Sequence, residues 1–251
     1  MLYTKEEIEN HVIDFDLWQH EVYEHFSSMM NQRETPYPCV PGIQGFMKNM
    51  LRFGFVDDPR TDESIDQLAG LLKEYGEISR DTGNYASLVI FCDTRALLEE
   101  QTTIDSYEDL FWNILNKTHK KDPSPWPEGI PENPEDPAWE FCFNGEPYFA
   151  FCATPAHEIR NSRFFPFLLL AFQPRWVFDE INDSTPFGRK IKKVIRKRLV
   201  EYDGIPTHPA LKWYGQKDNH EWKQYFLKDD ESTLPKCPFT SLKNKWKSLR
   251  P

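Results

Sequence analysis

The pattern of apolar and polar residues is clearest around Asn144-Gly145. Apolar side chains alternate on both sides of this dipeptide. A two-residue type I′ turn favours Asn-Gly because both positions need positive φ. The pattern predicts a hairpin in which Phe143 pairs with Glu146. A third apolar run, closed by Gln173, predicts a further strand.

Apolar residues at helical spacing predict helices beside these strands. The spacing holds over 61–77 and again over 107–119, and an apolar run at 85–92 between them predicts a buried strand. A long helix is expected to open the chain after a capping box at Thr4, and a basic helix is expected over 188–203. These patterns predict an α+β fold, with a mixed, largely antiparallel sheet flanked by amphipathic helices.

The chain is expected to form a single domain over residues 1–230. Within it, the proline-rich segment 120–137 is expected to be a surface loop, which could cover a site or simply join two elements. Residues 231–251 are polar, charged and interrupted by prolines. They are expected to form a weakly ordered tail or to lie over the surface.

Composition and charge narrow the class of function. Aromatic residues make up 15% of the chain, which indicates a packed core rather than a disordered chain. The net charge of -10 opposes general attraction to nucleic acid or to an anionic membrane. No apolar run is long enough to span a bilayer, and the five cysteines include no Cys-x-x-Cys pair. We therefore expect a cytoplasmic protein that needs neither a membrane nor a nucleic acid.

Candidate chemistry is concentrated just after the hairpin. Thr154 followed by Pro155 matches a helix N-cap with proline at the first helical position. A short helix would place His157 and Arg160 on one side. An imidazole and a guanidinium would then lie at the end of an aromatic sheet, where they could bind an anion or a metal-bearing cofactor. The alternative is that His157 caps a turn and the arginines pair with surface carboxylates.

Two other features have a functional and a structural interpretation. Cys39 lies in a Pro-Cys-Val turn, where it could be a thiolate ligand or, more commonly for a cysteine, a small buried apolar residue. Seven Lys and Arg residues lie between Arg189 and Arg198. They could bind an acidic protein, a nucleic acid or a phosphate, or they could form a solvated helix face.

Several separated motifs between residues 35 and 230 resemble the YqcI/YcgG family. The motifs that carry the resemblance are Tyr37-Pro38-Cys39, Asn144-Gly145-Glu146-Pro147, His157-x-x-Arg160-x-Ser162-Arg163, Phe172-Gln173-Pro174-Arg175, Tyr202-Asp203 and Glu221-Trp222-Lys223-Gln224-Tyr225. Some relatives in this family are heme proteins that N-hydroxylate the guanidino group of arginine or related amino acids. The resemblance implies a heme-dependent oxygenase with an amino-acid-like substrate.

The resemblance also implies roles for individual residues around a heme. His157 is the expected axial ligand of the iron, because neutral imidazole binds heme iron well. Cys39 is the competing ligand, since a thiolate favours O–O cleavage. Arg160 and Arg163 are expected to hold the heme propionates by charge-assisted hydrogen bonds.

The remaining roles concern the rest of the pocket. Gln173 and Arg175 are expected to complete the cofactor site, and Glu146 and Glu221 are expected to bind the guanidinium of the substrate. The electron donor is not identified by the sequence, and assembly as a homodimer stays open. The alternative function is a heme-binding or small-ligand-binding protein without turnover, and a third hypothesis makes the basic helix a docking site.

Overall fold

The computed structural model describes residues 1–10, 12–179, 181–182, 184–213 and 219–240. The strands form one five-stranded sheet in the order β1-β2-β5-β4-β3. Their bounds are β1 (Leu51–Val56), β2 (Ser87–Cys92), β3 (Phe141–Phe143), β4 (Glu146–Ala153) and β5 (Leu168–Pro174). Strands β1 and β2 are parallel, and the other three pairs are antiparallel. The predicted α+β fold with a mixed, largely antiparallel sheet is confirmed.

The hairpin forms where the sequence predicts it. Asn144 and Gly145 have φ angles of 51° and 75°, which the type I′ turn requires. Phe143 pairs with Glu146 as expected. Because this short turn fixes the register, the alternating residues of β4 fall on two distinct faces of the sheet.

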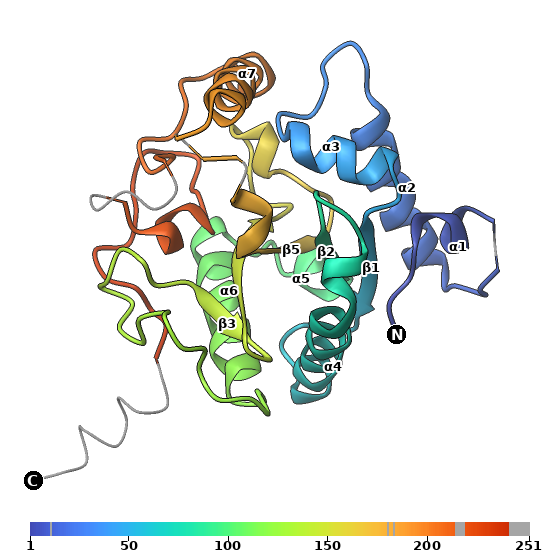
Figure 1. Cartoon of the computed structure of the whole chain (residues 1–251). Helices are drawn as coiled ribbons and strands as arrows, with labels where there is room; N and C mark the ends of the chain where they lie inside the picture. Colours follow the sequence, from blue (N-terminus) through green and yellow to red (C-terminus); the bar gives the residue numbers. More distant parts are fainter. Residues whose placement is uncertain (11, 180, 183, 214–218, 241–251) are drawn as a thin grey trace, which may run out of the picture.

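Helices cover both faces of the sheet (Figure 1). Their bounds are α1 (Lys5–Glu9), α2 (Leu17–Asn31), α3 (Val40–Met47), α4 (Asp62–Ile78), α5 (Arg95–Glu99), α6 (Ile104–His119) and α7 (Pro186–Asp203). Short 3₁₀ turns are η1 (Ser79–Asp81), η2 (Asn161–Arg163), η3 (Arg175–Phe178) and η4 (Glu221–Gln224). Figure 1 shows α3 and α7 next to each other at one end of the molecule, with α4 and α6 toward the other.

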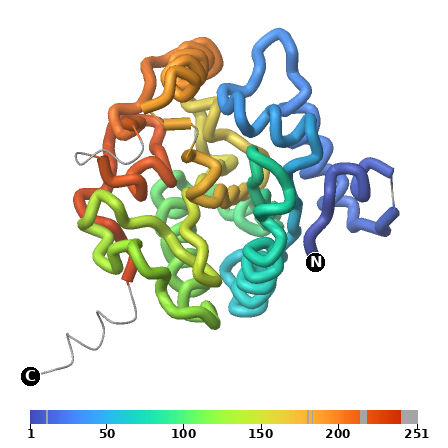
Figure 2. The backbone as a smooth tube through the Cα atoms, viewed as in Figure 1, coloured from blue at the N-terminus to red at the C-terminus, as the bar shows by residue number. Residues whose placement is uncertain are grey.

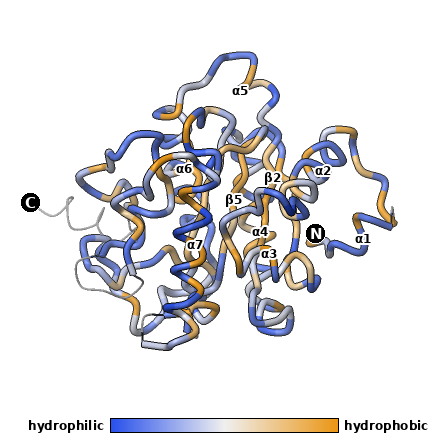
Figure 3. The backbone as a smooth tube through the Cα atoms, turned by 90° about the horizontal axis from the view of Figure 1, so that it is seen from above, coloured by the Kyte–Doolittle hydropathy of each residue, from blue (hydrophilic) through white to orange (hydrophobic). Residues whose placement is uncertain are grey.

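Two hydrophobic clusters hold the helices on the sheet. Helices α4 and α6 pack on one face, where Leu88 and Phe172 are fully buried. Helices α2 and α3 pack on the opposite face, where Phe26 and Phe46 contact the side of the sheet that carries Val89. Figure 3 shows β2 and β5 as mainly hydrophobic, whereas α7 mixes hydrophilic and hydrophobic residues.

Two predicted helices differ from the structure. The long opening helix is divided, because α1 ends at Glu9 and α2 begins only at Leu17, with its own capping box between Asp16 and Gln19. The short helix expected after Thr154 is absent. The Thr154 hydroxyl accepts a hydrogen bond from the amide of Ala156 at 3.3 Å, and the chain turns before η2. This local hydrogen bond competes with helix formation at the same residues.

Residues 231–240 pack against the rest of the domain. Cys237 and Phe239 are buried in the cluster that also holds α6. The Thr240 amide donates to the side chain of Asn116 at 2.8 Å, which ties this segment to α6. The backbone of this segment is drawn in red in Figure 2. The expected boundary at residue 230 is therefore not marked by a change in packing, and residues 241–251 lie outside the described part. No helix among the described residues is long and apolar enough to cross a membrane.

Candidate functional site

A cavity of about 270 Å³ lies on the α2 and α3 face of the sheet. Its floor includes Val89 of β2, Phe151 of β4 and Ala171 of β5. A cavity of about 150 Å³ is enough to hold a benzene molecule. The space next to the sheet is therefore large enough for a small molecule the size of an amino acid.

Helix α7 forms one wall of this cavity. Ile195, Leu199 and Asp203 line it from three successive turns of the helix, which agrees with their spacing along one helix face. Ile195 and Leu199 remain partly exposed, and Gly188 and Asp203 are the residues of α7 that are buried. The apolar stripe of α7 thus faces the cavity rather than a filled core.

Cys39, at the N-cap of α3, also lines the cavity. Its Sγ accepts a hydrogen bond from the Gly42 amide at 3.3 Å. A Cβ at position 42 would lie 3.1 Å from this sulfur, so glycine allows the close approach. Burial raises the pKa of the Cys39 thiol, while the Gly42 amide and the charge of Arg163 act in the opposite direction. Because burial is the largest of these effects, the thiol is the favoured form, and the helix-end amide and the nearby cation act toward the thiolate.

Arg163 is buried in the cavity wall, and no carboxylate in the described part of the chain is hydrogen-bonded to it. Its Nη1 donates to the carbonyls of Cys152 and Tyr225 at 3.2 and 2.9 Å, and its Nη2 donates to that of Gln224 at 2.9 Å. The guanidinium also lies 4.3 Å from the ring centre of Phe151. Burial lowers the pKa of Arg163 to about 10, so it stays charged at neutral pH.

Arg160 and Asp203 supply two more buried charges. The Nε of Arg160 donates to the carbonyl of Lys228 at 2.8 Å. Asp203 accepts from the amide and hydroxyl of Ser162 at 2.7 and 2.9 Å. Burial raises the pKa of Asp203, opposed by these two bonds and by the nearby arginines. Asp203 is the only acidic side chain among the described residues that line the cavity.

His208 is a further cavity residue that is almost fully buried. Its Nδ1 accepts from the Ala210 amide at 3.1 Å, which assigns the proton of the neutral ring to Nε2. This Nε2 makes no hydrogen bond within the described part of the chain. Burial, followed by the charges of Arg160 and Arg163, lowers the pKa of His208 to about 4, with the Ser232 carbonyl acting in the opposite direction. The ring is therefore neutral at physiological pH.

His157 lies behind this wall rather than in it. Its Nε2 is 2.8 Å from the carbonyl oxygen of Leu227, and its Nδ1 is 2.8 Å from the hydroxyl of Thr154. A carbonyl only accepts, so Nε2 carries the proton and Nδ1 accepts from the threonine. Burial lowers the pKa of His157. Both ring nitrogens are thus engaged, an arrangement that matches the turn-capping alternative, while the heme-ligand role stays a prediction.

The other predicted site residues divide into two groups. Gln173 lines the cavity together with Cys39, Arg160 and Arg163. The second group is outside the described lining, and each member has a charged or polar neighbour elsewhere. Glu146 pairs with Arg80 at 3.5 Å, Arg175 with Glu140 at 3.6 Å, and Glu221 accepts from Gln224 at 3.2 Å.

Asp203 and His208 were missed as site residues by the sequence analysis. Asp203 belongs to one of the family motifs, and its position on the apolar face of a basic helix was a usable signal, because a carboxylate there must find a polar partner. His208 follows in a short segment with no regular pattern. Nothing in its spacing indicates which element it contacts.

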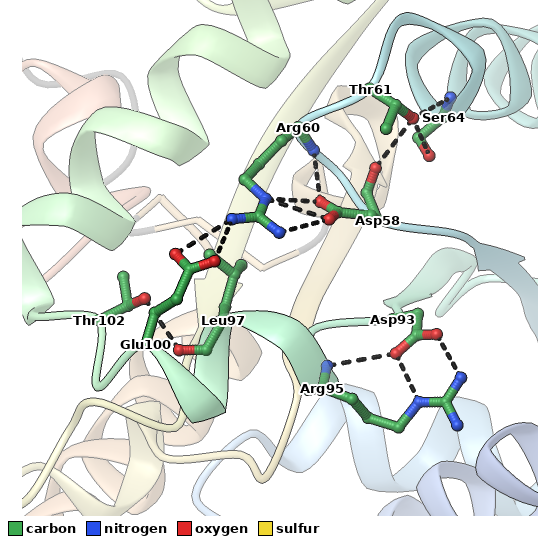
Figure 4. A network of polar contacts seen from close by, with 9 residues as sticks. All are labelled: Asp58, Arg60, Thr61, Ser64, Asp93, Arg95, Leu97, Glu100 and Thr102. Atoms are coloured by element: carbon green, nitrogen blue, oxygen red, sulfur yellow. Dashed lines mark hydrogen bonds and ion pairs between the residues drawn. The ribbon is translucent and has the colours of Figure 1, made fainter.

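A second charged region lies at the carboxyl ends of the parallel strands β1 and β2 (Figure 4). Arg60 lies between Asp58 and Glu100, with contacts of 2.6 and 2.8 Å. Asp93 and Arg95 form a separate pair at 2.6 Å. Ligands often bind at such strand ends, but here each carboxylate already has a guanidinium partner. The cavity is therefore the better candidate for a functional site.

Comparisons with known proteins place the chain in a family. The model of the YqcI/YcgG family matches residues 26–240, and the chain belongs to this family. It is 50% identical to the uncharacterized protein YqcI and 51% identical to the uncharacterized protein YcgG, both of Bacillus subtilis (strain 168). Each alignment covers 99% of this chain and 98% of the relative.

A more distant relative carries a name that states an activity. DcsA of Streptomyces lavendulae, provisionally named an N(omega)-hydroxy-L-arginine synthase, is 34% identical over 90% of this chain and 86% of its own length. No solved structure gives a significant match to the chain. The chain is thus a member of the YqcI/YcgG family. Its activity has to be inferred from the residues of the site.

Proposed function

We propose that this protein N-hydroxylates the guanidino group of arginine or a related amino acid, using a heme bound in the Cys39 cavity. One observation carries the proposal: a half-buried cysteine and two buried guanidiniums share the wall of one apolar cavity. The name of DcsA supports the reaction type and the substrate class. The names of the relatives YqcI and YcgG state no activity.

The chemistry of the cavity suits a heme. Because a heme is larger than an amino acid, part of the macrocycle would lie outside the enclosed volume of about 270 Å³, where the cavity is open to solvent. Cys39 would hold the iron in preference to His157, because its sulfur faces the cavity whereas both imidazole nitrogens are already hydrogen-bonded. Arg160 and Arg163 would bind the propionates. No group of three or more His, Cys, Asp or Glu side chains suited to a metal ion occurs among the described residues, so a macrocycle would have to supply most of the iron's ligands.

The reaction balances as a monooxygenation. A guanidino N–H becomes N–OH with one oxygen atom of O2, the other atom leaves as water, and two electrons and two protons come from a donor. A heme with a thiolate ligand supplies O–O cleavage chemistry when bound. The donor must be external, and a one-electron carrier protein with a flavin or iron-sulfur centre fits this need.

The side chains around the cavity would orient the substrate and exclude water. Asp203 replaces Glu146 and Glu221 as the candidate for binding the substrate guanidinium, because it is the acidic side chain that lines the cavity. Ile195 and Leu199 of α7 would cover the substrate on the side away from the sheet. Exclusion of water by such apolar residues strengthens the charge-assisted bonds inside the site.

An absorption spectrum with hemin tests the cofactor and its ligand. The parent protein is expected to show a shifted Soret band, which Cys39→Ser loses and His157→Ala retains. Circular dichroism of both variants controls for folding, because removal of the buried His157 also frees the carbonyl of Leu227. The reverse result, with the band lost only in His157→Ala, would restore the imidazole as ligand. A parent without any Soret shift would reject the heme.

Product formation tests the role of Asp203. In the heme-loaded protein, Asp203→Asn is expected to lower kcat/KM for arginine by roughly 10- to 100-fold, since a hydrogen bond to a charged group contributes about 1.5–3 kcal/mol. Glu146→Gln is the matched carboxylate-to-amide control, and its rate is expected to stay near that of the parent. Heme binding without any hydroxylated arginine in the parent would favour the alternative of a binding protein without turnover.

A further inference from the structure

The two faces of α7 differ in chemistry. The inner face carries Ile195, Leu199 and Asp203 toward the cavity. The outer face carries Lys190, Lys193 and Lys197, all exposed and spaced so that they share one side of the helix. The inner face is accounted for by the cavity, whereas nothing in the described chain covers the outer one.

Not every cation of α7 is available to a partner. The Nζ of Lys192 lies 3.8 Å from the ring centre of Trp213, and Arg196 donates to the Leu211 carbonyl at 3.0 Å. These two residues attach α7 to the segment that follows it. Lys190 and Lys193, by contrast, show no hydrogen bond or ion pair within the described residues, and Lys197 has only an exposed pair with Glu201 at 3.6 Å.

Apolar side chains lie beside the three lysines. Phe187 is 48% exposed and Val194 is 38% exposed. On an α-helix, these positions fall on the same flank of the lysine stripe. Exposed apolar groups beside exposed cations offer a partner both contact area and charge complementarity.

From these observations we infer that the outer face of α7 docks a small acidic one-electron carrier protein, which supplies the electrons of the reaction proposed above. The inference rests on that proposed function. A carrier on this face would be separated from the cavity by one helix, which is about 10–12 Å across with its side chains. Electron-transfer encounters use small interfaces, below about 1,200 Å² in total, and α7 is about 27 Å long at 1.5 Å per residue.

The charge distribution favours an acidic protein over a nucleic acid. The chain has a net charge of -10, yet seven of its 30 Lys and Arg residues lie between Arg189 and Arg198. A compact acidic protein can contact this basic stripe without contacting the acidic remainder of the surface. The positive charge of the stripe would also steer such a protein toward it. A duplex is an extended polyanion, and its length beyond the stripe would meet the acidic remainder of the surface.

Binding of a plant-type [2Fe–2S] ferredoxin to the full-length protein tests the inference without depending on turnover. The dissociation constant is measured by calorimetry at low and high salt, for hemin-free and hemin-loaded protein. The triple variant Lys190→Gln, Lys193→Gln, Lys197→Gln is expected to bind at least about tenfold more weakly and to show a flatter salt dependence. The matched control Lys48→Gln, Lys73→Gln, Lys120→Gln removes the same net charge from exposed positions elsewhere, and it is expected to bind like the parent.

Reduction of the heme separates this inference from the proposed function. Anaerobic stopped-flow reduction by the ferredoxin is expected to slow about tenfold in the α7 triple variant, whereas reduction by reduced lumiflavin, a small molecule that needs no docking surface, stays unchanged. Equal effects in both triple variants, or no ferredoxin binding by a heme-loaded parent, would overturn the docking site and leave the oxygenase intact. So would binding of a 20-base-pair duplex that is lost in the α7 variant while ferredoxin reduction is unaffected. A parent that takes up no hemin would overturn both.

Discussion

The two faces of the sheet are built from the same strands but differ in how completely they are packed. On the α4 and α6 face, Leu168, Leu170 and Phe172 of β5 are fully buried. On the opposite face the alternating residues of β5 become smaller and more polar, through Ala171 to Gln173. The first face therefore forms a filled core, whereas the second packs against α2 and α3 and leaves room for a ligand beside α7. A single strand thus encodes both a core and a site through its period of two.

The largest expected effect is a loss of stability on the filled face. Phe172→Ala is expected to lower the free energy of unfolding by about 3–5 kcal/mol, because it removes a fully buried ring and leaves a cavity. Urea unfolding followed by circular dichroism measures the change. If the loss stayed below about 1 kcal/mol, this face would be as loosely packed as the other, and the contrast between the faces would fail.

A second stability effect is expected in the wall of the cavity. Arg163→Leu keeps an apolar stem but leaves the Gln224 carbonyl without its donor, whereas the Tyr225 carbonyl keeps the amide of Cys152 as a donor. Since an unsatisfied buried group costs about 1–3 kcal/mol, the variant is expected to lose up to about 3 kcal/mol. Arg163→Lys is the control for charge alone. It is expected to recover little, because an ammonium cannot donate in the geometry of the guanidinium fork.

A third effect depends on pH and concerns His208. Its pKa is lowered to about 4 in the folded protein, below its ordinary value of about 6.5. The unfolded chain therefore binds the proton first, so this contribution to stability is present above pH 6.5 and is lost as the pH falls toward 4. His208→Asn keeps an acceptor near the Ala210 amide and cannot titrate. Its stability is expected to decline less than that of the parent between pH 7 and pH 4.5, by at most about 3 kcal/mol.

Urea unfolding at a series of pH values measures this difference. His157, whose pKa is also lowered, titrates in the same direction, so His157→Asn provides a comparison at a histidine outside the cavity lining. Parallel curves for the parent and for His208→Asn would mean that the charge of His208 does not affect folding.

The sequence correctly predicted the elements that depend on a local pattern of residues. The hairpin turn follows from the backbone needs of Asn144 and Gly145, and the basic helix follows from its apolar stripe. Partners of His157 and Arg163 could not be derived in this way. Besides the nearby Thr154 and Cys152, these partners are carbonyls of residues 224–227, more than 60 positions along the chain. Every residue has a backbone carbonyl, so the residue type does not show which carbonyl accepts a hydrogen bond. From the sequence, a histidine that is hydrogen-bonded to a carbonyl therefore cannot be told from one that is free to bind a metal.

The division of residues within the site has the same origin. Gln173 and Arg175 were both predicted in the pocket from the family resemblance, because they follow the third apolar run. Alternation along β5 places Gln173 on the cavity side, whereas Arg175 begins η3 after the strand has ended. Glu146, in contrast, was assigned to the substrate from its motif alone. The hairpin register pairs it with Phe143 at the sheet edge, where it contacts Arg80. Motif position shows that a residue belongs to the family, but only register and packing show which cavity it lines.

The smallest expected effect on stability is at Ala171, next to Phe172 but on the cavity side. Ala171→Leu adds three carbon atoms into empty space rather than into a filled core, so the free energy of unfolding is expected to change by less than about 1 kcal/mol. Binding of hemin or arginine in the cavity is expected to weaken by at least about tenfold. Spectral titration measures it beside Ala150→Leu, whose side chain points into the filled face. That control is expected to lose stability and keep its ligand-binding surface, and a stable Ala171→Leu protein with unchanged affinity would place the ligand outside this cavity.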